Sequence, residues 1–311
     1  MFVYRELASL VCDLGVSGKT LYSLSNHIFS HYRRVLIPKA HGKTRTLYIP
    51  DPVLMAVQRR IAQRLLPMEP VSPHACAYRP GGSPRLNALP HVGAAVVVKM
   101  DISRFFDHIT YPLVKEKAFP PERYSQANRI LLAMLCTRDN ALPQGAPTSP
   151  AISNIILRDF DGVMSAWCAK RGIRYTRYCD DMTFSGSFDP APLIRKVKRE
   201  LKRLGFFSND EKTRILHPWG RQQVTGAVVN EKLAAPRDYK RRLRQEVYYC
   251  RRFGAASHLE RLGLKNDPRQ YFLSLLGRVE HVLALEPGNR EMAAARQWLR
   301  EEMRKEPPAP V

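Results

Sequence analysis

Arg174-Tyr-Thr-Arg-Tyr-Cys-Asp-Asp-Met-Thr-Phe-Ser-Gly186 is the stretch that decides the fold of this chain. The residues on both sides of Asp180-Asp181 are the β-branched and aromatic types that strands favour, and the two acids supply a turn. The stretch therefore predicts a β-hairpin with adjacent carboxylates at its tip. Because such carboxylates repel each other, a fold tolerates them where a cation lies between them or where water solvates both. For Asp-Asp taken alone, the solvated turn is the simpler interpretation.

A third carboxylate, Asp101, shifts that interpretation. It lies in Ala94-Ala-Val-Val-Val-Lys-Met-Asp-Ile-Ser-Arg-Phe-Phe106, a strongly apolar and β-branched run. Such a run predicts a central strand that is buried on both faces. A carboxylate at the far end of that strand is costly unless it is exposed or bound to a metal. Phe105 and Phe106 follow closely and are expected to form a wall beside the acid.

The charge of the chain points to a polyanionic partner. The 311 residues are 44% hydrophobic and 25% charged, and 50 Lys and Arg against 28 Asp and Glu give a net charge of +22. This length is enough for two or three subdomains around a sizeable core. A charge of this size indicates nucleic acid most often, and a solubility surface or a membrane-surface binder otherwise. The basic residues are spread through the chain and cluster near its C-terminus, which favours an extended nucleic-acid track.

Several other classes are excluded by the sequence. It has no apolar run of transmembrane length, and Met1-Phe-Val-Tyr-Arg-Glu6 lacks the layout of a signal peptide. The six cysteines form no C-x-x-C pair and are expected to be reduced thiols in a cytoplasmic protein. Ser17-Gly-Lys-Thr20 and Gly42-Lys-Thr44 resemble the end of a P-loop, but Asp13 and Ile37 stand where its first glycine is needed. We therefore expect no ATP site and no membrane partner.

Two divalent ions about 3.5–4 Å apart can stabilise both the attacking and the leaving oxygen in phosphoryl transfer. Asp101 on one strand and Asp180 on a neighbouring hairpin can hold such a pair, because Mg²⁺ prefers oxygen ligands. Residues 37–50 predict two short strands joined by a basic turn, where Lys39 and Arg45 are placed to hold the β- and γ-phosphates of a nucleotide. Phe106 is placed to press on the sugar.

The rest of the catalytic half has a clear pattern. Ala141–Pro150 reads as a rigid Pro/Gly loop that contains Gln144 and ends in a helix start, with Thr148 or Ser149 as the cap. A buried helix follows through residues 152–164, and a basic helix is expected over 193–204.

At this point the chain resembles reverse transcriptases. Asp101 with Phe105-Phe106, Leu142-Pro-Gln-Gly145 and Tyr178-Cys-Asp-Asp181 occur in the order of that family's signature, and the resemblance extends from Lys39 to about Asn230. Asn87-Ala-Leu-Pro-His91 and Val224-Thr-Gly226 are similar to elements typical of the bacterial retron branch. Cys179 fills a variable place, where retron enzymes often have alanine, and it leaves the acids intact.

The resemblance implies an α+β right-hand polymerase with fingers, a palm with a small antiparallel sheet, and a helical thumb. The fingers are expected at 1–91 and 111–143 and the palm at 92–110 and 144–232. The RNA-binding thumb is expected at 233–305, before a disordered tail at 306–311. The length leaves no room for an RNase H, protease, integrase or maturase domain.

The resemblance also implies roles for single residues. Asp101 and Asp180 ligate two Mg²⁺ ions, which Mn²⁺ can replace; Asp181 is a weaker, metal-adjacent acid and Ile102 offers a backbone carbonyl. Phe106 is the steric gate against a ribose 2′-OH. The remaining nucleotide contacts are Gln144, Arg45, Lys39 and Lys212.

RNA contacts are expected from the two retron elements, at Asn87, His91, Val224, Thr225 and Gly226. They are also expected from a basic helix at 238–253, where Arg241 and Arg252 point away from an apolar stripe formed by Leu243, Val247 and Cys250. A charge run is usually only a solvated face, but beside a polymerase site a helix that grips a duplex or an RNA stem is favoured.

The implied activity is RNA-directed DNA synthesis of the retron type from dNTPs. A structured noncoding RNA is copied into multicopy single-stranded DNA, primed from a 2′-OH of a guanosine. Antiphage defence with an effector protein from a neighbouring gene, and a host RNase H that acts separately, are implied as well. The alternatives are another bacterial reverse transcriptase, from a different defence system or an intron, and a catalytically silent RNA-binding scaffold. The intact Asp101, Asp180, Asp181 and Gln144 argue against the scaffold.

Overall fold

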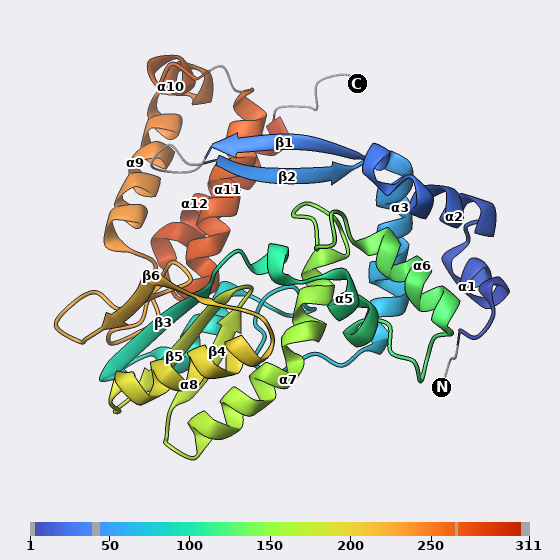
Figure 1. Cartoon of the computed structure of the whole chain (residues 1–311). Helices are drawn as coiled ribbons and strands as arrows, with labels where there is room; N and C mark the ends of the chain where they lie inside the picture. Colours follow the sequence, from blue (N-terminus) through green and yellow to red (C-terminus); the bar gives the residue numbers. More distant parts are fainter. Residues whose placement is uncertain (1–3, 39–43, 265–266, 306–311) are drawn as a thin grey trace. The chain divides into compact units, whose positions relative to one another are not determined.

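The computed structural model describes residues 4–38, 44–264 and 267–305. The chain divides into two compact units (Figure 1). Unit 1 comprises residues 1–82 and 98–215, and unit 2 comprises residues 83–97 and 216–311. Each unit is therefore built from two separate stretches of the sequence.

Unit 1 begins with helices, as the apolar spacing predicts. Leu10, Leu14, Leu21 and Leu24 are buried along them. Ser17 caps the second helix, because its Oγ accepts the backbone N–H of Thr20 at 3.1 Å. The elements are α1 (Leu7–Leu14), α2 (Gly18–Asn26) and a 3₁₀ turn, Ile28–His31.

The predicted basic hairpin is present and longer than expected. β1 (Tyr32–Pro38) pairs antiparallel with β2 (Thr44–Pro50), and Pro38 lies opposite Thr44. Lys39 and the glycine of the turn lie outside the described residues. Asp51 then caps α3 (Pro52–Arg60) by accepting the N–H of Leu54 at 2.8 Å. α3 is followed by a π-helical turn, Ile61–Leu65, and a 3₁₀ turn, Leu66–Met68.

A four-stranded sheet forms the centre of unit 1, with the strand order β4-β5-β3-β6. The predicted central strand, β3, lies between the hairpin and β6, and its residues are buried except for the half-buried Val96 and Lys99. The strands are β3 (Val96–Ile102), β4 (Arg174–Tyr178), β5 (Asp181–Gly186) and β6 (Ser208–Leu216).

Four helices accompany this sheet in unit 1. They are α5 (Tyr111–Lys117), α6 (Gln126–Cys136), α7 (Ser149–Ala169) and α8 (Pro190–Arg203). The predicted helix after the Pro/Gly loop is α7, which contacts β4. The predicted cap is wrong: Thr148 has helical backbone angles and makes no side-chain cap, while the Oγ of Ser149 donates back to the carbonyl of Pro143 at 2.8 Å.

Unit 2 is mainly helical, with its core formed by the 88–97 segment, a small hairpin and four helices. The expected apolar stripe is confirmed, since Leu243, Val247 and Cys250 are buried. Residues 84–91 form two short helical turns. The elements are α4 (Pro84–Ala88), a 3₁₀ turn (Leu89–His91), β7 (Gln223–Val224), β8 (Ala227–Val228), α9 (Arg237–Phe253), α10 (Ala255–Arg261), α11 (Pro268–Leu285) and α12 (Arg290–Lys305).

The mixture of helices and small sheets confirms the α+β class. The two units do not follow the expected subdomain borders, because residues 83–91 and 216–232 belong with the C-terminal helices in unit 2. The assignment of fingers, palm and thumb thus stays a prediction. Among the described residues, every helix is too short or too polar to cross a membrane.

Candidate active site

The acidic hairpin forms a turn one residue earlier than the sequence indicates. Tyr178 pairs with Asp181 in the β4–β5 ladder, so the two turn residues are Cys179 and Asp180. Cys179 adopts a left-handed backbone with φ of +59°. Asp180 therefore lies at the tip, while Asp181 is the first residue of β5.

The sheet brings Asp101 next to this hairpin. β3 neighbours β5, and the N–H of Ile102 donates to the carbonyl of Asp180 at 3.2 Å. Asp101 and Asp180, about eighty positions apart in sequence, thus meet where the two interior strands of the sheet, β3 and β5, lie side by side. Because side chains alternate along a strand, Lys99 lies on the same face of β3 as Asp101.

Lys212 is the cation that pairs with Asp101. Its Nζ lies 3.0 Å from both Oδ1 and Oδ2 of that carboxylate. The Asp101 side chain is 7% exposed and the Lys212 side chain is 61% exposed. Lys212 belongs to β6, the other neighbour of β3, so the acid is held between two strands.

The surroundings of Asp180 and Asp181 disfavour their ionised forms and raise the pKa of both. Burial, and then the charge of Asp101, raise the pKa of Asp180 to about 6, and Lys212 only partly opposes this rise. Burial also raises the pKa of Asp181, against the lowering effect of Lys99. Carboxylates that are held close together with so little compensation gain from a divalent cation, so the donor set fits Mg²⁺.

The fit is to a pair of acids rather than to a closed cage. In the part of the chain that the structure describes, no group of three or more His, Cys, Asp and Glu side chains is arranged to hold one metal ion. Asp101, Asp180 and Asp181 thus do not close around a single point. Mg²⁺ commonly takes only one or two protein carboxylates and completes its shell with water and substrate phosphates.

Gln144 is fixed against the basic hairpin. Its carbonyl accepts the N–H of Tyr48 in β2 at 2.8 Å. Gly145 has φ of +116°, and a Cβ at this position would meet the carbonyl oxygen of Tyr48 at 2.8 Å, so no other residue fits without a shift. The exposed Arg45 lies three residues before Tyr48 on the same strand. The predicted nucleotide contacts Gln144 and Arg45 are thus carried by two segments that pack together.

Phe106 follows the strand that carries Asp101. It lies in a 3₁₀ turn, Phe105–His108, where Phe105 is buried and Phe106 is half-buried. The two rings are 5.3 Å apart between centroids. The buried ring therefore supports the half-exposed one.

The predicted RNA-binding residues all lie in unit 2. Asn87, His91 and Val224 are buried, with 1%, 0% and 0% exposure. These three side chains are inside the unit, so the expectation that they contact RNA directly is corrected. Asn87 instead donates from Nδ2 to the Oγ1 of Thr225 at 3.0 Å.

Thr225 and Gly226 form the turn between β7 and β8. Both have positive φ, +45° and +83°. A left-handed backbone is unusual for a β-branched residue, and the bond from Asn87 helps to hold it. Thr225 is half-exposed and Gly226 is exposed. Of the five predicted RNA contacts in these two elements, this turn is therefore the part that is accessible to solvent.

Arg241 and Arg252 are exposed on α9. Neighbouring arginines of that helix are paired: Arg242 with Asp238, and Arg244 with Glu291. Arg241 and Arg252 make no ion pair or hydrogen bond with other residues that the structure describes, which leaves their charge available to a ligand.

Two residues near the acids were missed by sequence reasoning. Lys99 could have been found from the two-residue period of β3, which places it on the face of Asp101. Arg177 hydrogen-bonds the backbone of Cys179 and had no comparable signal, because its partners come from a distant helix.

A comparison with protein families identifies the chain. The model described as reverse transcriptase (RNA-dependent DNA polymerase) matches residues 37–265. This chain belongs to the reverse transcriptase family. That membership confirms the resemblance, and with it the right-hand polymerase fold.

Curated relatives of this reverse transcriptase carry retron names. It is 35% identical over 272 residues to the retron Mx65 reverse transcriptase of Myxococcus xanthus, covering 79% of this chain and 63% of that one. It is 34% identical to the retron Mx162 reverse transcriptase of the same organism, over 70% of this chain and 52% of that one. The retron Ec86 reverse transcriptase of Escherichia coli is 30% identical, over 79% and 78%. The chain thus spans less than two thirds of the length of the first two relatives.

Among solved structures, the alignment with the apo telomerase of Candida tropicalis covers 93% of this chain and 63% of the telomerase chain. The TM-score is 0.46 and the sequence identity is 13%.

Proposed function

We propose that this chain is an RNA-directed DNA polymerase of the retron type. The observation that carries the proposal is the meeting of Asp101, on β3, with Asp180, at the tip of the neighbouring β4–β5 hairpin, where the N–H of Ile102 donates to the carbonyl of Asp180 at 3.2 Å. The raised pKa of Asp180 supports it, because carboxyl groups whose pKa is strongly shifted by burial and by a neighbouring charge cluster at functional sites.

Asp101, Asp180 and the carbonyl of Ile102 would hold the two Mg²⁺ ions, with Asp181 beside them. Bound there, the ions lower the barrier by stabilising the attacking 3′-oxygen and the leaving pyrophosphate oxygen. Lys212 holds the carboxylate of Asp101 in place and offsets part of the charge of the acids.

The substrate is positioned by side chains around these acids. Gln144 lies on the loop that is fixed against β2, and it contacts the incoming dNTP. Arg45 on β2 and Lys39, which lies outside the described residues, bind the phosphates, since guanidinium and ammonium groups match their charge. Phe106 packs against the sugar and rejects a ribose 2′-OH, which selects deoxynucleotides.

Unit 2 binds the RNA. The Thr225-Gly226 turn and the exposed Arg241 and Arg252 are the contacts that its surface offers. The template is a structured noncoding RNA that is copied into multicopy single-stranded DNA from a guanosine 2′-OH. The product stays joined to its RNA, a host RNase H acts separately, and the complex acts in the cytoplasm in antiphage defence with a neighbouring-gene effector protein.

The polymerase activity is tested with Asp180→Asn/Asp181→Asn. We expect dNTP incorporation on an RNA template to fall to background while RNA binding in a filter assay is retained. Asp159→Asn removes a surface carboxylate of the same unit, which pairs with Lys117 and Arg158, and serves as the matched control. Equal incorporation by the double variant and the wild type would refute the assignment.

The retron part has its own test, which is sequencing of the nucleic acid that co-purifies with the protein. Branched RNA–DNA with a 2′,5′ linkage is the expected result. Linear cDNA without a branch would instead indicate another kind of bacterial reverse transcriptase.

A further inference from the structure

Arg177 is the largest fully buried side chain among the residues that the structure describes. It lies in β4, three residues before Asp180. Its Nε donates to Oδ1 of Asp161 at 2.9 Å, and its Nη2 donates to Oδ2 at 2.6 Å. Both side chains are 0% exposed. The pair is therefore a bidentate ion pair in a fully dry place, with its Asp supplied by α7.

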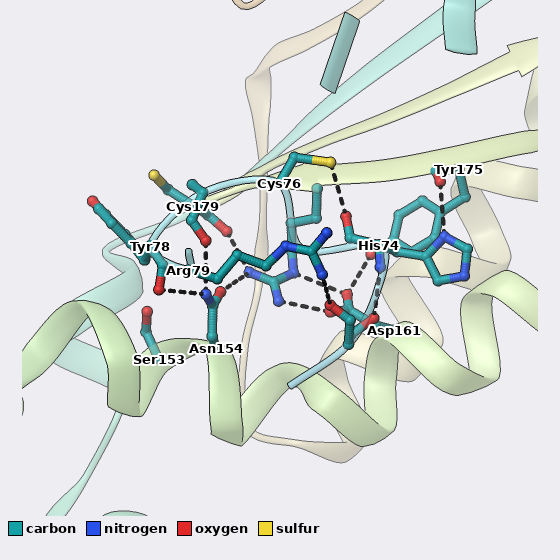
Figure 2. A network of polar contacts seen from close by, with 12 residues as sticks. His74, Cys76, Tyr78, Arg79, Ser153, Asn154, Asp161, Tyr175 and Cys179 are labelled. Atoms are coloured by element: carbon teal, nitrogen blue, oxygen red, sulfur yellow. Dashed lines mark hydrogen bonds and ion pairs between the residues drawn. The ribbon is translucent and has the colours of Figure 1, made fainter. Parts of the chain in front are cut away.

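The other edge of the guanidinium reaches the acidic hairpin. Nη1 donates to the carbonyl of Cys179 at 2.9 Å and to Oδ1 of Asn154 at 3.1 Å. Figure 2 shows Asn154 and Asp161 on the same helix, facing the strand and the turn that carries Cys179. Tyr175 completes the group, because its OH donates to Oδ1 of Asp161 at 2.7 Å.

A third segment is tied into the same network. The N–H of Arg177 donates to the carbonyl of His74 at 2.8 Å, and the N–H of Cys76 donates to the carbonyl of Arg177 at 2.7 Å. Nδ2 of Asn154 donates to the carbonyl of Ala77 at 2.8 Å. Helix α7, the 74–78 segment and the hairpin thus share one set of hydrogen bonds (Figure 2).

A stable fold does not require this arrangement. A buried ion pair can often be replaced by apolar residues at little cost, although removing one partner alone costs about 3–5 kcal/mol. The ion pair to Asp161 uses only the Nε and Nη2 edge of the guanidinium. The contact that needs explaining is the one to the carbonyl of Cys179, which only a planar, forked side chain can make while it also grips the acid.

The peptide bond between Cys179 and Asp180 is the part of the turn that is held. Cys179 has φ of +59°, a conformation that costs a non-glycine residue about 1 kcal/mol or more. The N–H of this same peptide contacts the carboxylate of Asp180. Rotation of the peptide would therefore move both the carbonyl that Arg177 binds and the acid at the hairpin tip.

We propose that Arg177 is a positioning residue, which fixes the Cys179–Asp180 peptide and thereby sets where Asp180 and Asp181 stand relative to Asp101. The inference rests on the proposed polymerase function for its kinetic consequence. Its geometric consequence, an ordered hairpin tip, is independent of catalysis.

The test uses two substitutions in the full-length protein. Arg177→Lys keeps the buried charge but loses the forked second edge. Arg177→Met/Asp161→Leu replaces the whole ion pair by apolar side chains, so that folding is retained without a lone buried charge. The matched control is Arg123→Met/Glu69→Leu, which removes another largely buried ion pair of unit 1 (Nε to Oε1, 3.0 Å; side chains 14% and 7% exposed).

Each variant is measured in three ways: thermal midpoint, kcat and KM for dNTP on an RNA template, and amide hydrogen exchange of residues 174–186 without metal. We expect both Arg177 variants to lose about 10- to 100-fold in kcat, the loss typical of a small misplacement of catalytic groups. Their template KM should stay near wild type, and exchange at Asp180 to Met182 should become faster. The control should shift only the thermal midpoint.

A folded Arg177 variant with wild-type kcat and wild-type exchange at the hairpin would overturn the inference and reduce the network to fold stabilisation. If the wild type itself incorporates no dNTP, the proposed function fails. The exchange measurement then still decides whether Arg177 orders the tip.

Discussion

The Nζ of Lys212 stands 3.0 Å from both carboxylate oxygens of Asp101. This symmetrical contact makes the lysine the nearest positive charge to the acid, and its own side chain remains largely exposed to solvent. Lys212 therefore stabilises the acids when no ion is bound. Because its side chain is largely exposed, it can move away when an ion binds.

Lys212→Met should lower the thermal midpoint in EDTA, because repulsion among the acids loses its counter-charge. The effect should be about 1 kcal/mol, because Lys212 is largely exposed and water screens the interaction, although Asp101 is buried. Added Mg²⁺ should raise the midpoint of the variant more than that of the wild type. Lys198→Met, which breaks the exposed pair to Asp210 on the same strand, is the control. An equal Mg²⁺ response in all three proteins would contradict this role.

Phe106→Ala should increase ribonucleotide incorporation. The half-buried ring is placed after β3 and supported by Phe105, so its loss removes a rigid wall. Discrimination between dNTP and rNTP, measured as the ratio of kcat/KM values, should fall by about 10- to 100-fold. Phe207→Ala removes an exposed ring of the same unit and should leave the ratio unchanged. An unaltered ratio for Phe106→Ala would end the gate role.

Arg241→Gln/Arg252→Gln should flatten the salt dependence of RNA affinity. Each phosphate contact that is lost should reduce the slope of log K against log salt by about 0.7–0.9. Filter binding between low and physiological salt measures this slope. Arg195→Gln/Lys202→Gln removes two exposed charges from α8 and controls for net charge. The same slope in both double variants would place the RNA track elsewhere.

Glu246→Gln should destabilise unit 2 in a pH-dependent manner. Burial alone would raise the pKa of Glu246, but its bonds to Arg278 (2.6 and 2.7 Å) and Tyr271 (2.9 Å) outweigh burial and lower it. A lowered folded-state pKa stabilises the protein above the unfolded value of about 4.3, and that contribution is lost as the pH falls through the folded value.

The variant should thus lose about 2 kcal/mol at pH 7, and its difference from the wild type should shrink below pH 4. Denaturant unfolding at several pH values measures this. Glu301→Gln, on an exposed turn of α12, should show no such trend. A difference that stays constant down to pH 3 would show that the carboxylate charge is not the cause.

The sequence was sufficient for the elements around the acids, because their signals are local. The apolar, β-branched run at 94–106 predicts β3, and the residues that flank Asp180-Asp181 predict the hairpin. The turn residues were wrong by one position, since the pairing of Tyr178 with Asp181 depends on the ladder and not on turn propensity. Neither predicted side-chain cap forms. Thr148 makes no cap hydrogen bond, and the hydroxyl of Ser149 donates to the carbonyl of Pro143 in the preceding loop.

Contacts between distant segments could not be predicted in this way. Arg177 reads as a solvent-facing strand residue until Asp161 arrives from a helix sixteen positions earlier. Asn87 reads as a surface contact until its amide meets Thr225, which is 138 residues away. In both cases the polar group is satisfied by a partner that no local period reveals.

Gly145 sets a limit on how this family member can drift. With no room for a methyl group against the carbonyl of Tyr48, the loop and the strand share a fixed separation. Any inherited change that thickens either backbone contact would push Gln144 and Arg45 apart together. Compensation would then have to come from both segments at once, because the bare Cα of Gly145 sets how closely the loop approaches β2.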